Sequence, residues 1–379
     1  MKRTRSFDQI DVLRGFAALS VVVLHSIAHF DWQSFPATGV LSWFRLGWMG
    51  VDLFFVISGF VIALSAFAHI QKLGATGFRK PFMMRRIARI TPLYYLTGLV
   101  FLVFVTPEVI HQSDFALNLI SHLGFFHNTF WKFSGAINGV NWTIGVEMQF
   151  YLLIALTAPF LRNCRWWLIP LIAFIVAWVW RFGAYSLVPI DPVTGPFIRF
   201  VATVQLPGVL DQFAIGVLLA RFVMTPQADR IIATLSRHFW VPVAVATLGV
   251  WAMMYLFWLP GGLWETAWKS VFWRTFESAG FGLVVLAACC LNHRKLLRWT
   301  TPFRYLGTIS YGIYLWHLPV ILTIKKIEGL SQEYAFVLTV AATVTLASLS
   351  WHFFEKRFLG PSKKAAPPAS PAAKVAATN

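Results

Sequence analysis

The stretch Asp11–His25, DVLRGFAALSVVVLH, decides the class of fold. With its neighbours it supplies the roughly 20 mostly apolar residues that a membrane-spanning helix needs. It nevertheless contains Arg14 and His25, although a charged side chain at bilayer depth costs roughly 3 kcal/mol. The two lie eleven residues apart, which places them on one helical face and roughly 16 Å apart along the axis. We therefore expect this face to line a polar interior.

The composition of the whole chain agrees with a membrane protein. Of its 379 residues, 58% are hydrophobic and 12% are charged, whereas soluble domains contain about 25% charged residues. The 18 Trp and 36 Phe residues suit the aromatic belts of membrane interfaces. Three cysteines offer neither a disulfide framework nor a metal-ligand spacing. No metal is expected.

The hydropathy pattern predicts an all-α, polytopic membrane protein with about ten transmembrane helices. The expected spans are residues 10–30, 48–68, 90–106, 142–160, 166–182, 207–223, 239–258, 271–291, 306–324 and 334–354. Because no small-residue cleavage site follows the first apolar stretch, we expect a retained first span. The transmembrane domain is predicted over residues 1–359. Residues 360–379, rich in Pro and Ala, are expected to form a disordered cytoplasmic tail.

The distribution of basic residues predicts the orientation. With a cytoplasmic N-terminus, most of the 32 Lys and Arg residues fall in cytoplasmic segments, as the positive-inside rule requires. Both termini are then cytoplasmic, and the location is the inner cell membrane. This bias also explains the net charge of +17, so no nucleic-acid partner is expected. Arg181 and Arg274 are assigned to the outer boundary.

Several other spans carry polar residues at a depth close to that of His25. These are Asp52, Glu147, Asp211, Glu277 and His317. Isolated residues of this kind usually hydrogen-bond neighbouring helices. Several at one depth favour a shared polar site. The main alternative to a catalytic site is a transporter or flippase that uses the same residues as a proton relay. A scaffold or receptor, in which these residues are only structural, is the third interpretation.

The remaining histidines are interpreted more simply. His29 lies four residues after His25, but no carboxylate-rich or Cys motif accompanies the pair, which disfavours a metal site. His111, His122 and His127 fall in a predicted outer loop and are interpreted as solvated residues.

A basic segment, FRKPFMMRRIARITPLYY, precedes the third span. Arg85 and Arg89 share a helical face, and Arg86 lies one turn from Arg89. Contact with anionic lipid would account for the segment, at about 1 kcal/mol per basic residue. A phosphate clamp is the other interpretation, because guanidinium groups match phosphate oxygens.

Taken together, six motifs resemble those of the acyltransferase 3 family, integral-membrane enzymes that acylate extracytoplasmic glycans and some other acceptors. In order they are DVLRGFAALSVVVLH, GVDLFFVISGFVI, RRIARITPLYY, NWTIGVEMQFYL, ISYGIYLWHLPV and FFEKRF, so the resemblance covers residues 7–358. The chain departs from the family at Met148, where a second Glu is common, and before Asp211, where an Arg is common. We expect no fused soluble hydrolase-like domain, so any later relay step would be absent or supplied by a separate periplasmic partner.

The resemblance implies acyl transfer from cytoplasmic acyl-CoA, with acetyl-CoA as the favoured donor. The acceptor would be a hydroxyl of a glycan or lipid-linked carbohydrate at the outer face, and membrane lipids would surround the protein. His25 would act as general base, oriented by Glu147 or Asp52; a covalent acyl-His25 intermediate is a second mechanism. The arginines expected to bind the phosphates of CoA are Arg14, Arg85, Arg86 and Arg89. The residues expected to contact the substrates are Trp142, Tyr151, Asp211 and His317.

Overall fold

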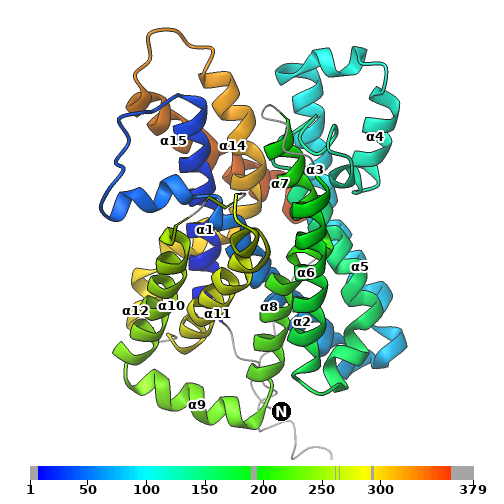
Figure 1. Ribbon diagram of the computed structural model, residues 1–379, viewed down its shortest axis with the longest axis vertical. Helices are drawn as coiled ribbons and strands as arrows, with labels where there is room; N and C mark the ends of the chain where they lie inside the picture. The colour runs from blue at the N-terminus through cyan, green and yellow to red at the C-terminus, as the bar shows by residue number, and fades with distance from the viewer. Residues whose placement is uncertain (1–6, 189–193, 261, 264, 292–293, 360–379) are drawn as a thin grey trace, which may run out of the picture.

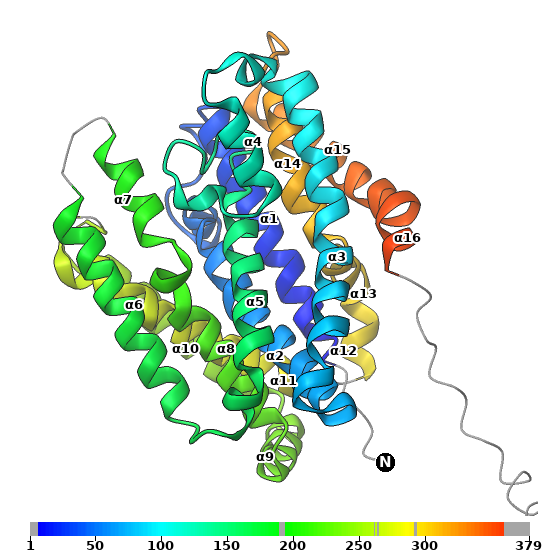
Figure 2. The same cartoon turned by 90° about the vertical axis from the view of Figure 1, so that its right-hand side faces the viewer.

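The computed structural model describes residues 7–188, 194–260, 262–263, 265–291 and 294–359. The predicted tail, residues 360–379, lies outside the described residues. Throughout the described ranges the regular structure is helical and no strand occurs. Figures 1 and 2 show the long helices standing side by side as a bundle.

Nine described helices are long and apolar enough to cross a membrane, and a tenth candidate is a pair bent by 70°. Their bounds are α1 (Gln9–His29), α2 (Met49–Gly77), α3 (Arg79–Val100, continued to Val105), α5 (Trp142–Asn163), α6 (Leu168–Leu187), α8 (Leu210–Val223, preceded by Leu206–Val209), α10 (Trp240–Trp258), α11 (Arg274–Cys290, preceded by Lys269–Trp273), the bent pair α13 (Thr301–Thr308) and α14 (Ser310–Ile324), and α15 (Gln332–Ser350, continued to Phe358). Each predicted span corresponds to one of these, so the all-α membrane fold is confirmed. The side on which the termini lie stays a prediction.

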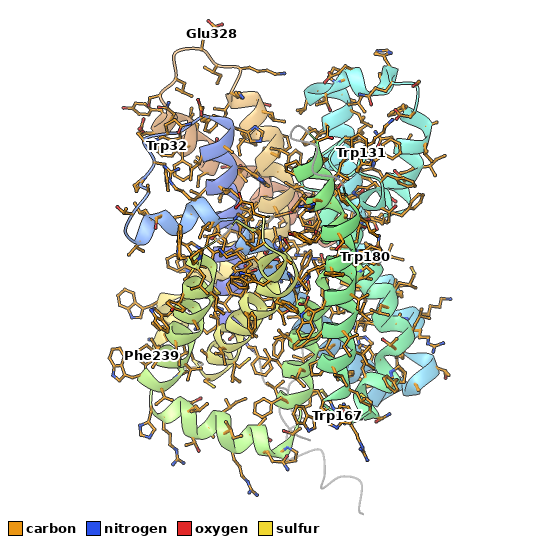
Figure 3. The ribbon with its side chains drawn as sticks, viewed as in Figure 1. Trp32, Trp131, Trp167, Trp180, Phe239 and Glu328 are labelled. Carbon is orange, nitrogen blue, oxygen red and sulfur yellow. The ribbon has the colours of Figure 1, made fainter. Side chains whose placement is uncertain are left out.

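Shorter helices connect or extend the long ones. They are α4 (Phe115–Leu123), α7 (Gly195–Thr203), α9 (Pro226–Arg237), α12 (Arg294–Trp299) and α16 (Lys356–Phe358). In Figure 1, α9 lies across one end of the bundle and α4 lies near the other. Figure 3 shows Trp32 and Trp131 near one end, and Trp167 and Phe239 near the opposite end. Aromatic side chains at both ends fit the two interfaces of a membrane.

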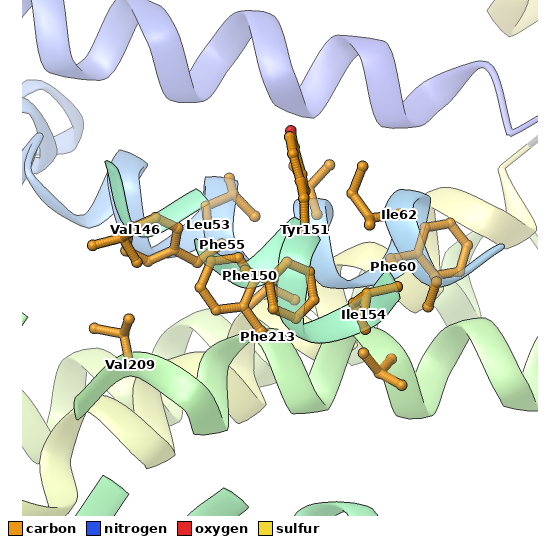
Figure 4. Packing of buried hydrophobic residues seen from close by; sticks show 14 of the residues in the cluster. Leu53, Phe55, Phe60, Ile62, Val146, Phe150, Tyr151, Ile154, Val209 and Phe213 are labelled. Atoms are coloured by element: carbon orange, nitrogen blue, oxygen red, sulfur yellow. The ribbon is translucent and has the colours of Figure 1, made fainter. Parts of the chain in front are cut away.

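The backbones of α2 and α8 touch each other at two glycines. A Cβ atom on Gly59 would lie 2.1 Å from the carbonyl oxygen of Phe213, and one on Gly216 would lie 2.1 Å from that of Val56. Small residues let membrane helices approach until their backbones touch. Beside this contact the rings of Phe150 and Phe213 stack with centroids 4.0 Å apart (Figure 4). These contacts fix α2, which lines the site described below.

The segment between α3 and α5 differs from the expectation of a solvated loop. His111 is exposed, but His122 and His127 are buried, and their rings stack with centroids 3.9 Å apart. The Tyr94 hydroxyl donates to the carbonyl of His122 at 3.2 Å and lies 3.4 Å from Nδ1 of His127. The interpretation of His122 and His127 as solvated is therefore wrong, because the segment folds back over α3. Burial lowers the pKa of His122 to about 4 and that of His127 to about 3.

Candidate functional site

Two buried cavities adjoin each other inside the bundle. The histidine cavity, about 110 Å³, has polar walls made by His25 of α1, Asp52 of α2 and Arg274 of α11. The arginine cavity, about 140 Å³, is lined by Arg14, Arg86, Arg89, Ser58, Glu147 and Tyr151. Val51 and Tyr314 line both cavities. In Figure 2, α1 runs through the middle of the bundle. Of its two predicted polar residues, Arg14 lines the arginine cavity and His25 lines the histidine cavity.

His25 contacts another imidazole. Its Nδ1 lies 2.8 Å from Nε2 of His317, and the two ring planes differ by only 2°. His317 is fully buried, whereas His25 is half-buried and lines the histidine cavity. The sequence predicted His317 as a substrate contact, whereas in the structure its ring contacts the ring of His25.

The two carboxylates expected to orient His25 lie in different places. Asp52 shares the histidine cavity with His25. Its Oδ1 accepts from Nη1 of Arg274 at 2.5 Å and from Nε2 of Gln212 at 2.7 Å. Glu147 lies in the arginine cavity. There its Oε1 accepts from the Ser58 hydroxyl at 2.6 Å and from the Tyr151 hydroxyl at 2.5 Å.

Four predicted arginines occupy two environments. Arg14, Arg86 and Arg89 line the arginine cavity, whereas Arg85 is exposed and its Nη1 lies 2.8 Å from Nε2 of His69. Two residues of the segment that follows α15 contact the guanidinium group of Arg89. Its Nη1 lies 3.4 Å from Oε2 of Glu355, and its guanidinium lies 4.5 Å from the centre of the Trp351 ring. The predicted basic cluster therefore divides into three cavity-lining residues and one surface residue.

The remaining predicted substrate contacts also separate. Trp142 lines the histidine cavity and meets the Phe200 ring edge to face at 5.3 Å. Tyr151 lines the arginine cavity, and Figure 4 shows its hydroxyl pointing toward α1. Asp211 lines neither cavity. It is fully buried, pairs with Arg181, and accepts from the Thr275 hydroxyl at 2.5 Å.

Sequence reasoning missed the cations that compensate the buried aspartates. Arg181 and Arg274, which were assigned to the outer boundary, are 0% and 5% exposed and pair with Asp211 and Asp52 respectively. A π-helical turn at Lys269–Trp273 precedes Arg274, and such turns often re-aim a side chain at a functional site. The sequence carried one signal of these ion pairs: each arginine lies near the end of an apolar span, at the depth of an aspartate in another span.

Glu277 is the third carboxylate of this buried region. It is 0% exposed, and neither of its oxygens has a hydrogen-bond partner in the part of the chain that the structure describes. The charges of Asp52, Arg274, Arg181 and Asp211 act on it electrostatically. Among the described residues, no group of three His, Cys, Asp or Glu side chains is placed to hold a metal ion.

A helical membrane bundle with a cationic cavity next to an imidazole-bearing cavity defines a polytopic membrane protein with an internal polar site. The chain belongs to the acyltransferase 3 family, since the family model, described as an acyltransferase domain, matches residues 7–352.

Named relatives agree with this family. The chain is 26% identical over 382 residues to "O-acetyltransferase OatA" of Staphylococcus aureus, covering 94% of this chain and 57% of that protein. It is 30% identical over 399 residues to "Putative peptidoglycan O-acetyltransferase YrhL" of Bacillus subtilis, covering 93% and 55%. It is also 30% identical over 319 residues to "Putative acetyltransferase ORF330" of Acidianus two-tailed virus, covering 83% of each. The chain thus spans less than two thirds of the length of the two bacterial relatives. No solved structure matches.

Proposed function

We propose that the protein transfers an acetyl group from acetyl-CoA to a hydroxyl of a carbohydrate acceptor. The donor would enter from the cytoplasmic side, and the acceptor from the outer side, of the inner cell membrane. The observation that carries the proposal is the pair of adjoining cavities, because one is lined by three arginines and the other by His25. Family membership and the named relatives favour this activity over the proton relay of a transporter.

The arginine cavity suits the donor. Guanidinium groups match phosphate oxygens in charge and geometry, so Arg14, Arg86 and Arg89 would hold the phosphates of CoA. Arg14 and His25 are roughly 16 Å apart along α1, a distance that an extended pantetheine arm can span. The thioester would then reach the boundary between the cavities, where Val51 and Tyr314 lie.

The histidine cavity suits the acceptor. His25 would take the proton of the acceptor hydroxyl as general base. The hydroxyl oxygen would attack the thioester carbonyl, forming the new C–O bond and breaking the C–S bond, and the proton would pass from His25 to the departing sulfur. Asp52 faces the same cavity, so its charge would stabilise the imidazolium that forms.

The test is a measurement of thiol release and label transfer by the purified full-length protein. Acetyl-CoA labelled in the acetyl group serves as donor, and triacetylchitotriose serves as a soluble hydroxyl acceptor. We expect His25→Ala to lower the rate of acetyl transfer at least about 100-fold, while His111→Ala, at an exposed histidine, keeps it. Transfer by His25→Ala at the wild-type rate would remove His25 from the mechanism. An intact thioester under all conditions would favour the transporter.

A further inference from the structure

The contact between His25 and His317 constrains where the protons of both rings lie. A neutral imidazole has one N–H donor and one lone pair. At 2.8 Å between Nδ1 of His25 and Nε2 of His317, one of these nitrogens donates and the other accepts. If His25 accepts, its Nε2 carries the hydrogen and cannot take a proton. If His25 donates, its Nε2 keeps a free lone pair.

The surroundings of His317 favour the second arrangement. Its Nδ1 is buried and makes no hydrogen bond of regular geometry among the described residues. The backbone carbonyls of Ile313 and Tyr314, one turn earlier in α14, are among the groups that act electrostatically on this ring. A lone pair on Nδ1 would face these oxygens with like partial charge, whereas an N–H is attracted to them. This attraction favours the tautomer of His317 with its hydrogen on Nδ1, which leaves Nε2 as the acceptor.

We propose that His317 is a positioning residue that fixes the tautomer of His25. It accepts the Nδ1–H of His25 and leaves the lone pair of His25 Nε2 facing the histidine cavity. This inference rests on the proposed function, in which His25 is the base. When His25 becomes imidazolium, the same hydrogen bond gains a charged donor and becomes stronger.

The fold supplies reasons for an imidazole in this place. His317 is fully buried, and a carboxylate there would be a further buried charge that needs a partner. Pro319, two residues later, has no N–H and so leaves the carbonyl of Leu315 unpaired within the helix. Asn138 donates to that carbonyl at 3.3 Å. This hydrogen bond links α14 to the segment before α5, close to His317.

The test separates hydrogen bonding from packing by two substitutions. His317→Phe keeps a planar ring without an acceptor, and His317→Gln places an amide oxygen near the position of Nε2. With acetyl-CoA and triacetylchitotriose, we expect kcat to fall about 100-fold in His317→Phe with little change in KM for acetyl-CoA. His317→Gln should recover most of kcat and shift the acid limb of the pH profile. His122→Phe, at a buried histidine outside both cavities, controls for lost packing.

Equal loss of kcat in His317→Phe and His317→Gln, or no loss in His317→Phe, would overturn the inference. A second measurement does not depend on turnover. Nitrogen NMR of the full-length protein labelled at histidine, assigned with His25→Gln and His317→Gln, should show His25 protonated at Nδ1 and bare at Nε2. The reverse tautomer would also overturn it. Failure of the proposed function is distinguishable, because it shows as transfer retained by His25→Ala, or as an intact thioester with the wild-type protein, whatever the tautomer.

Discussion

Arg274 of α11 and Asp52 of α2 form an ion pair in the wall of the histidine cavity, with Nη1 and Oδ1 2.5 Å apart and both side chains almost completely buried. Gln212 of α8 adds a hydrogen bond to the same aspartate oxygen. Side chains from three helices therefore meet at one carboxylate oxygen. The buried negative charge of Asp52 is stabilised by groups from the other two helices.

The ion pair gives the first prediction. Arg274→Ala should lower the free energy of unfolding by about 3–5 kcal/mol, because it leaves the charge of Asp52 buried without its partner. The measurement is thermal unfolding in detergent followed by Trp fluorescence. The double variant Asp52→Asn with Arg274→Gln should recover part of the loss. Arg85→Ala, at an exposed residue, should change stability by less than about 0.5 kcal/mol; an effect as large as that of Arg274→Ala would contradict the account.

The division of the basic cluster gives the second prediction. Arg86→Ala and Arg89→Ala should each raise KM for acetyl-CoA at least about tenfold, because each removes a charged contact to phosphate worth roughly 1.5–3 kcal/mol. Direct binding of labelled acetyl-CoA gives the same comparison without an acceptor. Arg85→Ala is the matched control, since Arg85 contacts His69 outside the cavity. Equal effects of all three substitutions would favour the lipid-contact interpretation of this segment.

The third prediction concerns pH. The unfolded histidines bind protons below about pH 6.5, but burial holds the pKa of His122 at about 4 and that of His127 at about 3. Between about pH 6.5 and pH 4 the unfolded state binds more protons than the folded state, so the free energy of unfolding falls as the pH is lowered across this range. For His122 alone the loss approaches about 3 kcal/mol at the acid end. Unfolding temperatures measured from pH 7.5 to 4 should show the slope.

Two variants check this assignment of the pH dependence. His122→Phe should reduce the slope by roughly half, because His122 no longer titrates in either state while His127 still does. His111→Gln should leave the slope unchanged, because His111 is exposed. A slope that stays the same in His122→Phe would show that another group is responsible.

The fourth prediction concerns the contact between α2 and α8. Gly216→Ala should destabilise the protein by about 1–3 kcal/mol, because its Cβ would lie 2.1 Å from the carbonyl oxygen of Val56. Gly98→Ala is the matched control, since nothing lies within 4 Å of the position of its Cβ. Comparable unfolding temperatures for the two variants would mean that α2 and α8 separate more readily than their packing indicates.

Much of the fold could be predicted from the sequence, because apolar stretches of spanning length are a local property. The shared face of Arg14 and His25 follows from helical geometry, and each of these residues lines one of the two adjoining cavities. The length of α2 and α3 was underestimated, since both helices continue into polar sequence beyond the apolar stretch.

The pairing of residues from different spans could not be predicted in the same way. Helical geometry gives the depth of Asp52 and Asp211 but not which helices pack around them, so Arg274 and Arg181 were not recognised as their partners. For the same reason His317 was placed among the substrate contacts without its link to His25. The burial of His122 depends on how the segment between α3 and α5 folds back, which no local pattern reveals.

The close backbone approach at Gly59 and Gly216 holds α2 firmly against α8. Because α2 lines both cavities, this packing fixes one wall of the passage between them. Tyr314 faces α2 across the boundary and is held by the Thr143 hydroxyl at 3.0 Å and the carbonyl of Val140 at 3.2 Å. In the proposed reaction, a thioester that moves between the two cavities would therefore pass between the Tyr314 side chain and α2.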